Sequence, residues 1–206
     1  MDFALMLKTL DQIAIEHGTD KATVFTRTYA RPKSYTVHLE KFFEPLRDQP
    51  IKLLEIGIGG GESARTWLEF FEHGSIYGVD IVQNTNPFNT PKSGVHSRYD
   101  FRQGNQGDKT MLACLIADFG PDFDIIVDDG SHLPGDIITS FGCLWSTVRP
   151  GGFYVIEDLG CGFTSEGFPS HLDWLRGLMD LTNIGVGAID SIYFSRELAI
   201  LAKTKT

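Results

Sequence analysis

The chain has 206 residues, of which 42% are hydrophobic and 22% charged, a composition that indicates an ordinary globular protein rather than a fibrous or disordered one. Its 18 Lys and Arg residues against 27 Asp and Glu residues leave a formal net charge of -9, the wrong sign for a protein that neutralises nucleic-acid phosphates. No apolar run reaches the roughly 20 residues that cross a bilayer, and the first residues lack the layout of a signal peptide. We therefore expect a cytoplasmic protein with no nucleic-acid and no membrane partner.

The first fifty residues are expected to form a helical lead-in to the main domain. Apolar residues at helical spacing predict one helix from Phe3 to Ile15 and a second from Ser34 to Phe43. Pro50 then precedes a change in the pattern. We assign residues 1–50 to the lead-in and residues 51–206 to the main domain.

Beyond residue 50, short apolar runs alternate with helical segments, which is typical of βα units and a parallel sheet. The predicted strands are Lys52 to Ile56, Ser75 to Val79, Ser97 to Arg102, Asp124 to Val127 and Gly152 to Ile156. The predicted helices are Ser63 to Phe71, Asp108 to Phe119, Ile137 to Val148 and His171 to Leu181. Two final apolar runs, Ser191 to Ser195 and Leu198 to Lys203, predict a β-hairpin. The expected fold is a Rossmann-like, doubly wound α/β sheet of seven mostly parallel strands that ends in an antiparallel hairpin.

A glycine-rich turn follows the first predicted strand, in the run L-L-E-I-G-I-G-G-G-E. Glycine at Gly57 and Gly59 lets the backbone turn sharply and lets a ligand lie against it. An NAD-binding fingerprint would place a third glycine where this chain has Glu62. The match to an NAD site is therefore imperfect. An NAD-dependent oxidoreductase and a non-catalytic nucleotide-binding module are the two alternative functions.

Two carboxylates accompany this turn. Glu55 precedes the first glycine by two residues and can accept a hydrogen bond from the amino group of an amino-acid-like ligand. Asp80 ends the next strand, where Rossmann-like folds bind ribose hydroxyls; the alternative is that it only caps the following loop.

The most informative run is D-I-I-V-D-D-G-S-H, which ends at His132. It brings acids and a histidine to the carboxyl edge of the sheet, where open α/β folds place their chemistry. The next strand also ends in acids, Glu157 and Asp158, which converge with Asp129 if the two strands are neighbours. Clustered carboxylates repel one another, and Mg²⁺ relieves this cost. The alternative is that the acids cap helices and that His132 is structural.

These motifs resemble those of class I methyltransferases. E-I-G-x-G-G-G followed by V-D-I resembles their first two motifs, and the terminal hairpin resembles their reversed last strand. The resemblance implies that S-adenosylmethionine is the cofactor. The expected cofactor-binding residues, with Asn105 and Gln106 near the adenine, are Glu55, Gly57, Gly59, Asp80, Asn105, Gln106 and Asp128.

V-D-D-G-S-H together with I-E-D-L resembles a narrower group, the metal-dependent sugar O-methyltransferases of macrolide and related antibiotic biosynthesis, of the mycinamicin and rhamnosyl type. H-G-T-D-K at residues 17–21 and F-E-P-L-R at residues 43–47 also resemble that group. The resemblance implies that Mg²⁺ is bound by Asp129, Glu157 and Asp158, with His132 as the base and Asp129 as a second catalytic residue.

The same resemblance implies an acceptor hydroxyl on a sugar or another diol-bearing natural product, and a homo-oligomer. Two departures bear on it. Asn105 stands where an aspartate is usual, and about fifty residues precede the first strand where members often carry an additional N-terminal domain. The two long connections, residues 82–96 and 159–170, are candidate lids over the site.

Overall fold

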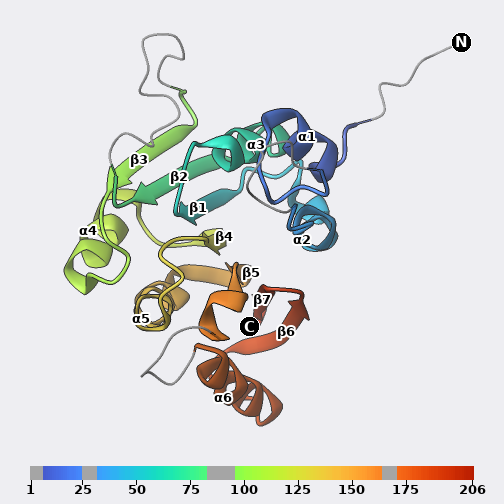
Figure 1. Ribbon diagram of the computed structural model, residues 1–206. Helices are drawn as coiled ribbons and strands as arrows, with labels where there is room; N and C mark the ends of the chain where they lie inside the picture. Colours follow the sequence, from blue (N-terminus) through green and yellow to red (C-terminus); the bar gives the residue numbers. More distant parts are fainter. Residues whose placement is uncertain (1–6, 25–31, 83–95, 164–170) are drawn as a thin grey trace, which may run out of the picture.

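The computed structural model describes residues 7–24, 32–82, 96–163 and 171–206, and within them seven strands form one sheet (Figure 1). The strands are β1 (Lys52–Ile56), β2 (Ser75–Asp80), β3 (Tyr99–Gln103), β4 (Phe123–Asp128), β5 (Val148–Ile156), β6 (Ile189–Ser195) and β7 (Leu198–Lys203). They lie in the order β3-β2-β1-β4-β5-β7-β6. Strands β1 to β5 pair in parallel, and β7 is antiparallel to both β5 and β6. The predicted fold, including its terminal hairpin, is confirmed.

Helices lie on both faces of this sheet (Figure 1). They are α1 (Leu10–His17), α2 (Thr36–Phe43), α3 (Glu62–Phe70), α4 (Lys109–Phe119), α5 (Pro134–Leu144) and α6 (His171–Asn183). Helix α5 begins earlier than predicted because Pro134 suits the first helical turn, where its missing N–H is not needed. It also ends earlier, since Val148 belongs to β5.

Local signals fix the ends of several helices. Thr9 and Gln12 form a capping box at the start of α1, with the Thr9 hydroxyl 3.2 Å from the Gln12 nitrogen. Gly18 ends the same helix at φ 75°, a left-handed conformation that glycine adopts without strain. Asp108 caps α4 by accepting a hydrogen bond from the backbone N–H of Thr110 at 2.8 Å.

The sheet separates two apolar cores, because successive side chains of a strand point to opposite faces. On one face, Leu53 and Val127 pack with α1, α2 and α3. On the other, Leu54 and Ile126 pack with α4, α5 and α6. Residues of the lead-in, such as Phe43, are fully buried in the first core, so the lead-in packs directly on the sheet domain.

Asp11 of α1 binds residues on both sides of the undescribed segment 25–31. Its carboxylate accepts hydrogen bonds from the backbone N–H of Thr23 at 2.8 Å and from the Thr36 hydroxyl at 2.5 Å. This arrangement brings Lys21, Lys33 and Tyr35 to the carboxyl ends of the central strands. The candidate lids fall largely on residues 83–95 and 164–170, which lie outside the described residues. Within the described part of the chain, no helix is both long and apolar enough to span a bilayer.

Candidate active site

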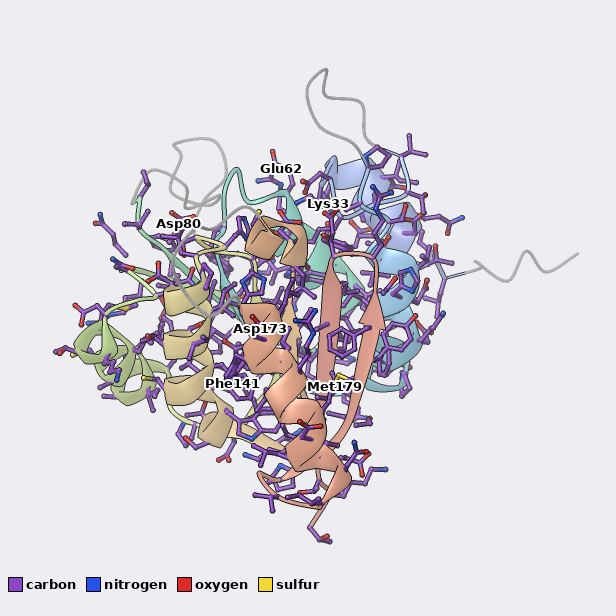
Figure 2. The ribbon with its side chains drawn as sticks, turned by 60° about the horizontal axis from the view of Figure 1, so that its bottom comes forward. Lys33, Glu62, Asp80, Phe141, Asp173 and Met179 are labelled. Carbon is purple, nitrogen blue, oxygen red and sulfur yellow. The ribbon has the colours of Figure 1, made fainter. Side chains whose placement is uncertain are left out.

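Two cavities adjoin at the carboxyl ends of the central strands. The first, of about 380 Å³, is lined by the glycine-rich turn, by Asp80, Asp129, His132 and Asp158, and by residues 18–21 and Lys33 of the lead-in. The second, of about 300 Å³, is lined by Asn105, Gln106, Ser131 and Asp136, and it shares Gly57, Asp80 and Gly130 with the first. Figure 2 shows Lys33, Glu62 and Asp80, all lining the first cavity, along one end of the molecule. The two spaces are of the size that small-molecule sites occupy.

The glycine-rich turn lines the first cavity, and its Gly57 lines the second cavity as well. Gly57 has φ 83°, and a side chain there would collide with the backbone carbonyl of Asp129. Asp80 holds the turn in place, since one of its carboxylate oxygens accepts hydrogen bonds from the N–H groups of Ile58 at 2.9 Å and Gly59 at 3.2 Å. Its other oxygen accepts from Val82 at 2.9 Å, as loop capping requires. Asp80 therefore lines both cavities and also orders the adjoining loops.

The predicted adenine side is organised by Gln106. Its amide nitrogen donates to Asp128 at 2.9 Å, and its oxygen accepts from the Ser131 N–H at 2.6 Å. Asp128 also accepts from the Ser140 hydroxyl at 2.5 Å, and burial raises its pKa. Asn105 lines the second cavity, whereas Asp128 is buried and is not among the residues that line it. The predicted contacts of these residues with a cofactor remain predictions.

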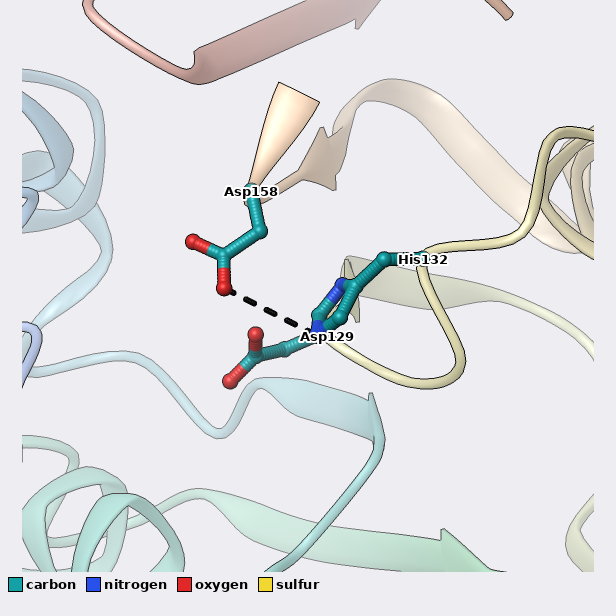
Figure 3. A group of neighbouring side chains, drawn as sticks. All are labelled: Asp129, His132 and Asp158. Atoms are coloured by element: carbon teal, nitrogen blue, oxygen red, sulfur yellow. Dashed lines mark ion pairs between the residues drawn. The ribbon is translucent and has the colours of Figure 1, made fainter. Parts of the chain in front are cut away.

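Asp129, His132 and Asp158 come together, as Figure 3 shows. One ligand atom from each lies within 4.8 Å of the others, and the His132 Nε2 atom is 3.6 Å from an Asp158 oxygen. Both His132 and Asp158 have φ 57°, in the left-handed region that Asp and His enter more readily than most residues. The neighbouring strands β4 and β5 therefore do bring acids from both strand ends to one place.

Residues of the lead-in hold Asp158 from the opposite side. The ammonium group of Lys33 donates to one carboxylate oxygen, and the Tyr35 hydroxyl donates to the other at 2.7 Å. Burial alone would raise the pKa of Asp158, but these hydrogen bonds lower it below its ordinary value. Asp158 is therefore held as a carboxylate at the edge of the cavity.

Lys21 pairs with the other acids. Its Nζ atom lies 2.5 Å from an Asp129 oxygen, 2.5 Å from Glu157 Oε2 and 3.8 Å from Glu55 Oε1. Burial by itself lowers the pKa of Lys21, but the carboxylates outweigh it and the pKa is raised well above its ordinary value. Glu157 is fully buried, and burial raises its pKa although Lys21 opposes this. The ammonium group of Lys21 thus provides a positive charge that neutralises part of this acidic cluster.

The arrangement fits a divalent cation bound by oxygen. The carboxylates of Asp129 and Asp158 face one space, and such hard ligands are those that Mg²⁺ prefers. Glu157 Oε1 is buried and has no hydrogen-bond partner among the described residues, so one donor oxygen near the cluster is uncommitted. The role of Glu157 as a third metal ligand remains a prediction. Glu55 is buried and accepts a hydrogen bond from Ser63, and its contact with the cofactor also remains a prediction.

The contacts of Lys21, Lys33 and Tyr35 are not predictable from the sequence pattern. Lys21 is the last residue of H-G-T-D-K, a motif that supports the family resemblance but indicates no contact for the lysine. The lysine lies 108 residues before Asp129 in the chain, and only the fold shows that they meet.

Comparison with known proteins places these features in context. Residues 54–159, slightly more than half of the chain, match a family model described as a methyltransferase domain. The chain is 38% identical over 181 residues to the demethylmacrocin O-methyltransferase of Streptomyces fradiae, covering 81% of this chain and 43% of the relative. It is 41% identical over 173 residues to the mycinamicin VI 2''-O-methyltransferase of Micromonospora griseorubida, covering 76% of this chain and 41% of the relative.

Among solved structures, the MycE methyltransferase of the mycinamycin pathway, in complex with Mg, SAH and mycinamycin VI, superposes with a TM-score of 0.81. The sequence identity is 30%, and the match covers 97% of this chain and 55% of that chain. The chain spans less than half the length of the two curated relatives.

Proposed function

The chain belongs to the family of methyltransferase domains, and from this premise we propose that it transfers the methyl group of S-adenosylmethionine to an oxygen atom of a small molecule. The observation that carries the proposal is the first cavity, in which the glycine-rich turn that suits the cofactor adjoins Asp129, His132 and Asp158. A methyl donor and an acceptor hydroxyl bound there would meet within one space.

We propose Mg²⁺ as the second cofactor, held by Asp129 and Asp158 with Glu157 as the third predicted ligand. When bound, the cation would supply positive charge beside the acceptor oxygen and favour its deprotonation. His132 lies where an imidazole nitrogen can accept the hydroxyl proton. Transfer of the methyl group from sulfur to that oxygen would leave S-adenosylhomocysteine, and His132 would hold the proton that the hydroxyl gives up. The chain's main contribution is to position donor and acceptor.

The proposed acceptor is a hydroxyl of a sugar or another diol-bearing natural product. This rests on the relatives, whose names describe O-methylation of demethylmacrocin and of mycinamicin VI. A role in antibiotic biosynthesis, a cytoplasmic location and a homo-oligomeric state belong to the same proposal. The family match favours methyl transfer over an NAD-dependent oxidoreductase. A non-catalytic binding module is the alternative that the experiment must separate.

The test is a transfer assay with radiolabelled S-adenosylmethionine and a panel of acceptors that includes demethylmacrocin and mycinamicin VI, with and without chelator. We expect labelled product that disappears on chelation. His132→Ala should lower the rate by roughly 100-fold or more, because it removes the proton acceptor.

The matched control is His73→Ala, since His73 is exposed and lies outside the lining of either cavity. It should transfer at the wild-type rate. Equal labelling in the presence of chelator would remove the metal from the mechanism. Cofactor binding measured by calorimetry without any transfer to the panel would favour the binding module.

A further inference from the structure

Lys21 is a buried cation in contact with acids from three strand ends. Its side chain is 2% exposed, and it reaches Glu55 in β1, Asp129 after β4 and Glu157 after β5. These strands are adjacent in the sheet, so one ammonium group ties together the central carboxyl edge. Ion pairs on the protein surface contribute little, whereas breaking a buried pair leaves an uncompensated charge at a large cost.

Lys21 compensates carboxylates that have few other partners. Glu157 Oε1 and Glu55 Oε1 are buried without a hydrogen-bond partner among the described residues. Glu55 accepts one hydrogen bond from Ser63 at its other oxygen, and Glu157 Oε2 accepts from Lys21 at 2.5 Å. Without the ammonium group, two fully buried acids would face Asp129 with little to offset their repulsion.

Asp129 belongs to two sets at once. It pairs with Lys21 on one side, and it forms the group with His132 and Asp158 on the other. Because Asp129 is shared, its ion pair with Lys21 affects the binding of any ligand to the group of Asp129, His132 and Asp158.

We propose that Lys21 is a positioning residue whose ammonium group serves as a built-in cation, holding Asp129 against Glu157 when no divalent ion is bound and competing with that ion for Asp129. The inference rests on the metal site of the proposed function. Lys33 pairs with Asp158 in a similar way, but 22% of its side chain is accessible to solvent. Its ion pair is therefore more strongly screened, and Lys21 should have the larger effect on stability and on Mg²⁺ binding.

The first test is the melting temperature of Lys21→Met in chelator and in excess Mg²⁺. In chelator, the variant should melt roughly 6 °C or more below the wild type, because the acids have lost their cation. Excess Mg²⁺ should recover most of this loss, so the Mg²⁺-induced shift should be larger in the variant than in the wild type. The matched control is Lys203→Met, which removes a partly buried lysine that donates to backbone carbonyls of residues 145, 146 and 148. Its Mg²⁺-induced shift should equal that of the wild type.

The second test is calorimetric titration with Mg²⁺ alone. Removing the competing ammonium group should tighten Mg²⁺ binding by roughly tenfold or more. A Lys21→Met protein with wild-type Mg²⁺ affinity, or with weaker affinity, overturns the proposal. The proposal is also overturned if Lys21→Met melts at the wild-type temperature in chelator.

A double variant covers the case in which Lys21→Met does not fold. Adding Glu157→Gln removes the buried charge that the lysine neutralised, so the double variant should fold and melt above the single variant. If Glu157→Gln fails to restore folding, the loss arises from packing and the proposal is rejected. None of these measurements requires methyl transfer, so an inactive protein that shows them contradicts only the proposed function.

Discussion

Glu55 shows how burial alters the chemistry of a single carboxyl group. It is fully buried at the end of β1, accepts a hydrogen bond from the Ser63 hydroxyl at 2.9 Å and lies 3.8 Å from Lys21. Burial raises its pKa to about 7, although Lys21 and Ser63 oppose the shift. Near neutral pH, a small change in pH therefore changes the charge of Glu55 and with it the net charge of the cluster around Lys21.

This raised pKa predicts a pH-dependent stability that Glu55→Gln removes. Since the folded state holds the Glu55 proton more tightly than the unfolded state, the free energy of unfolding falls as the pH rises from about 4.5 to about 7. In the variant this fall in the free energy of unfolding is absent. The difference in the free energy of unfolding between variant and wild type should therefore move in favour of the variant by up to about 3 kcal/mol from pH 5 to pH 8.

Urea denaturation at several pH values measures the difference. Glu72→Gln, which changes an exposed carboxylate, should follow the wild-type curve and serves as the control. Parallel curves for Glu55→Gln and the wild type would contradict the assignment.

At the scale of the element, the turn between β1 and α3 depends on one glycine. Gly57 combines a positive φ of 83° with direct contact to the backbone after β4, whereas Gly59 has φ 52° and open space around it. The turn therefore needs Gly57 for two reasons and Gly59 for one.

Gly57→Ala should lower the free energy of unfolding by roughly 2 kcal/mol or more, because the new methyl group meets a backbone carbonyl that cannot rotate away. It should also weaken the binding of S-adenosylhomocysteine, since Gly57 lines both cavities. Gly59→Ala should cost only the strain of the left-handed conformation, about 1 kcal/mol. Denaturation and calorimetry check both variants, and equal losses would show that the contact with Asp129 is unimportant.

In the molecule as a whole, the site is built from parts of the chain that lie more than 100 residues apart in the sequence. The lead-in provides Lys21, Lys33 and Tyr35, and the sheet provides the acids that they contact. Because the first cavity is lined by both parts, a ligand bound there contacts the lead-in and the sheet together.

Ligand binding should therefore stabilise the whole fold. At a concentration of S-adenosylhomocysteine 100 times its Kd, the gain is about 2.7 kcal/mol, which for a domain of this size raises the melting temperature by roughly 5–10 °C. NAD at the same concentration should produce no shift, since Glu62 replaces the third glycine of its fingerprint. Differential scanning fluorimetry checks this, and a shift with NAD alone would revive the oxidoreductase.

The amino-acid pattern alone predicts the order and type of the helices and strands, the terminal hairpin and the position of acids at two strand ends. Each of these follows from local periodicity, from glycine and proline positions, and from the rule that parallel strands share a carboxyl edge. The acids at residues 129 and 158 met as predicted because β4 and β5 are neighbours.

Which cations neutralise those acids depends on contacts between distant parts of the chain. Glu157 follows the same strand as Asp158 but faces Lys21, because adjacent residues at a strand end project in different directions. Lys21 and Asp129 are 108 residues apart in the sequence, and no local pattern indicates which distant side chain pairs with a buried charge. Pairing across such a distance depends on how α1, α2 and their connecting loop pack against the sheet.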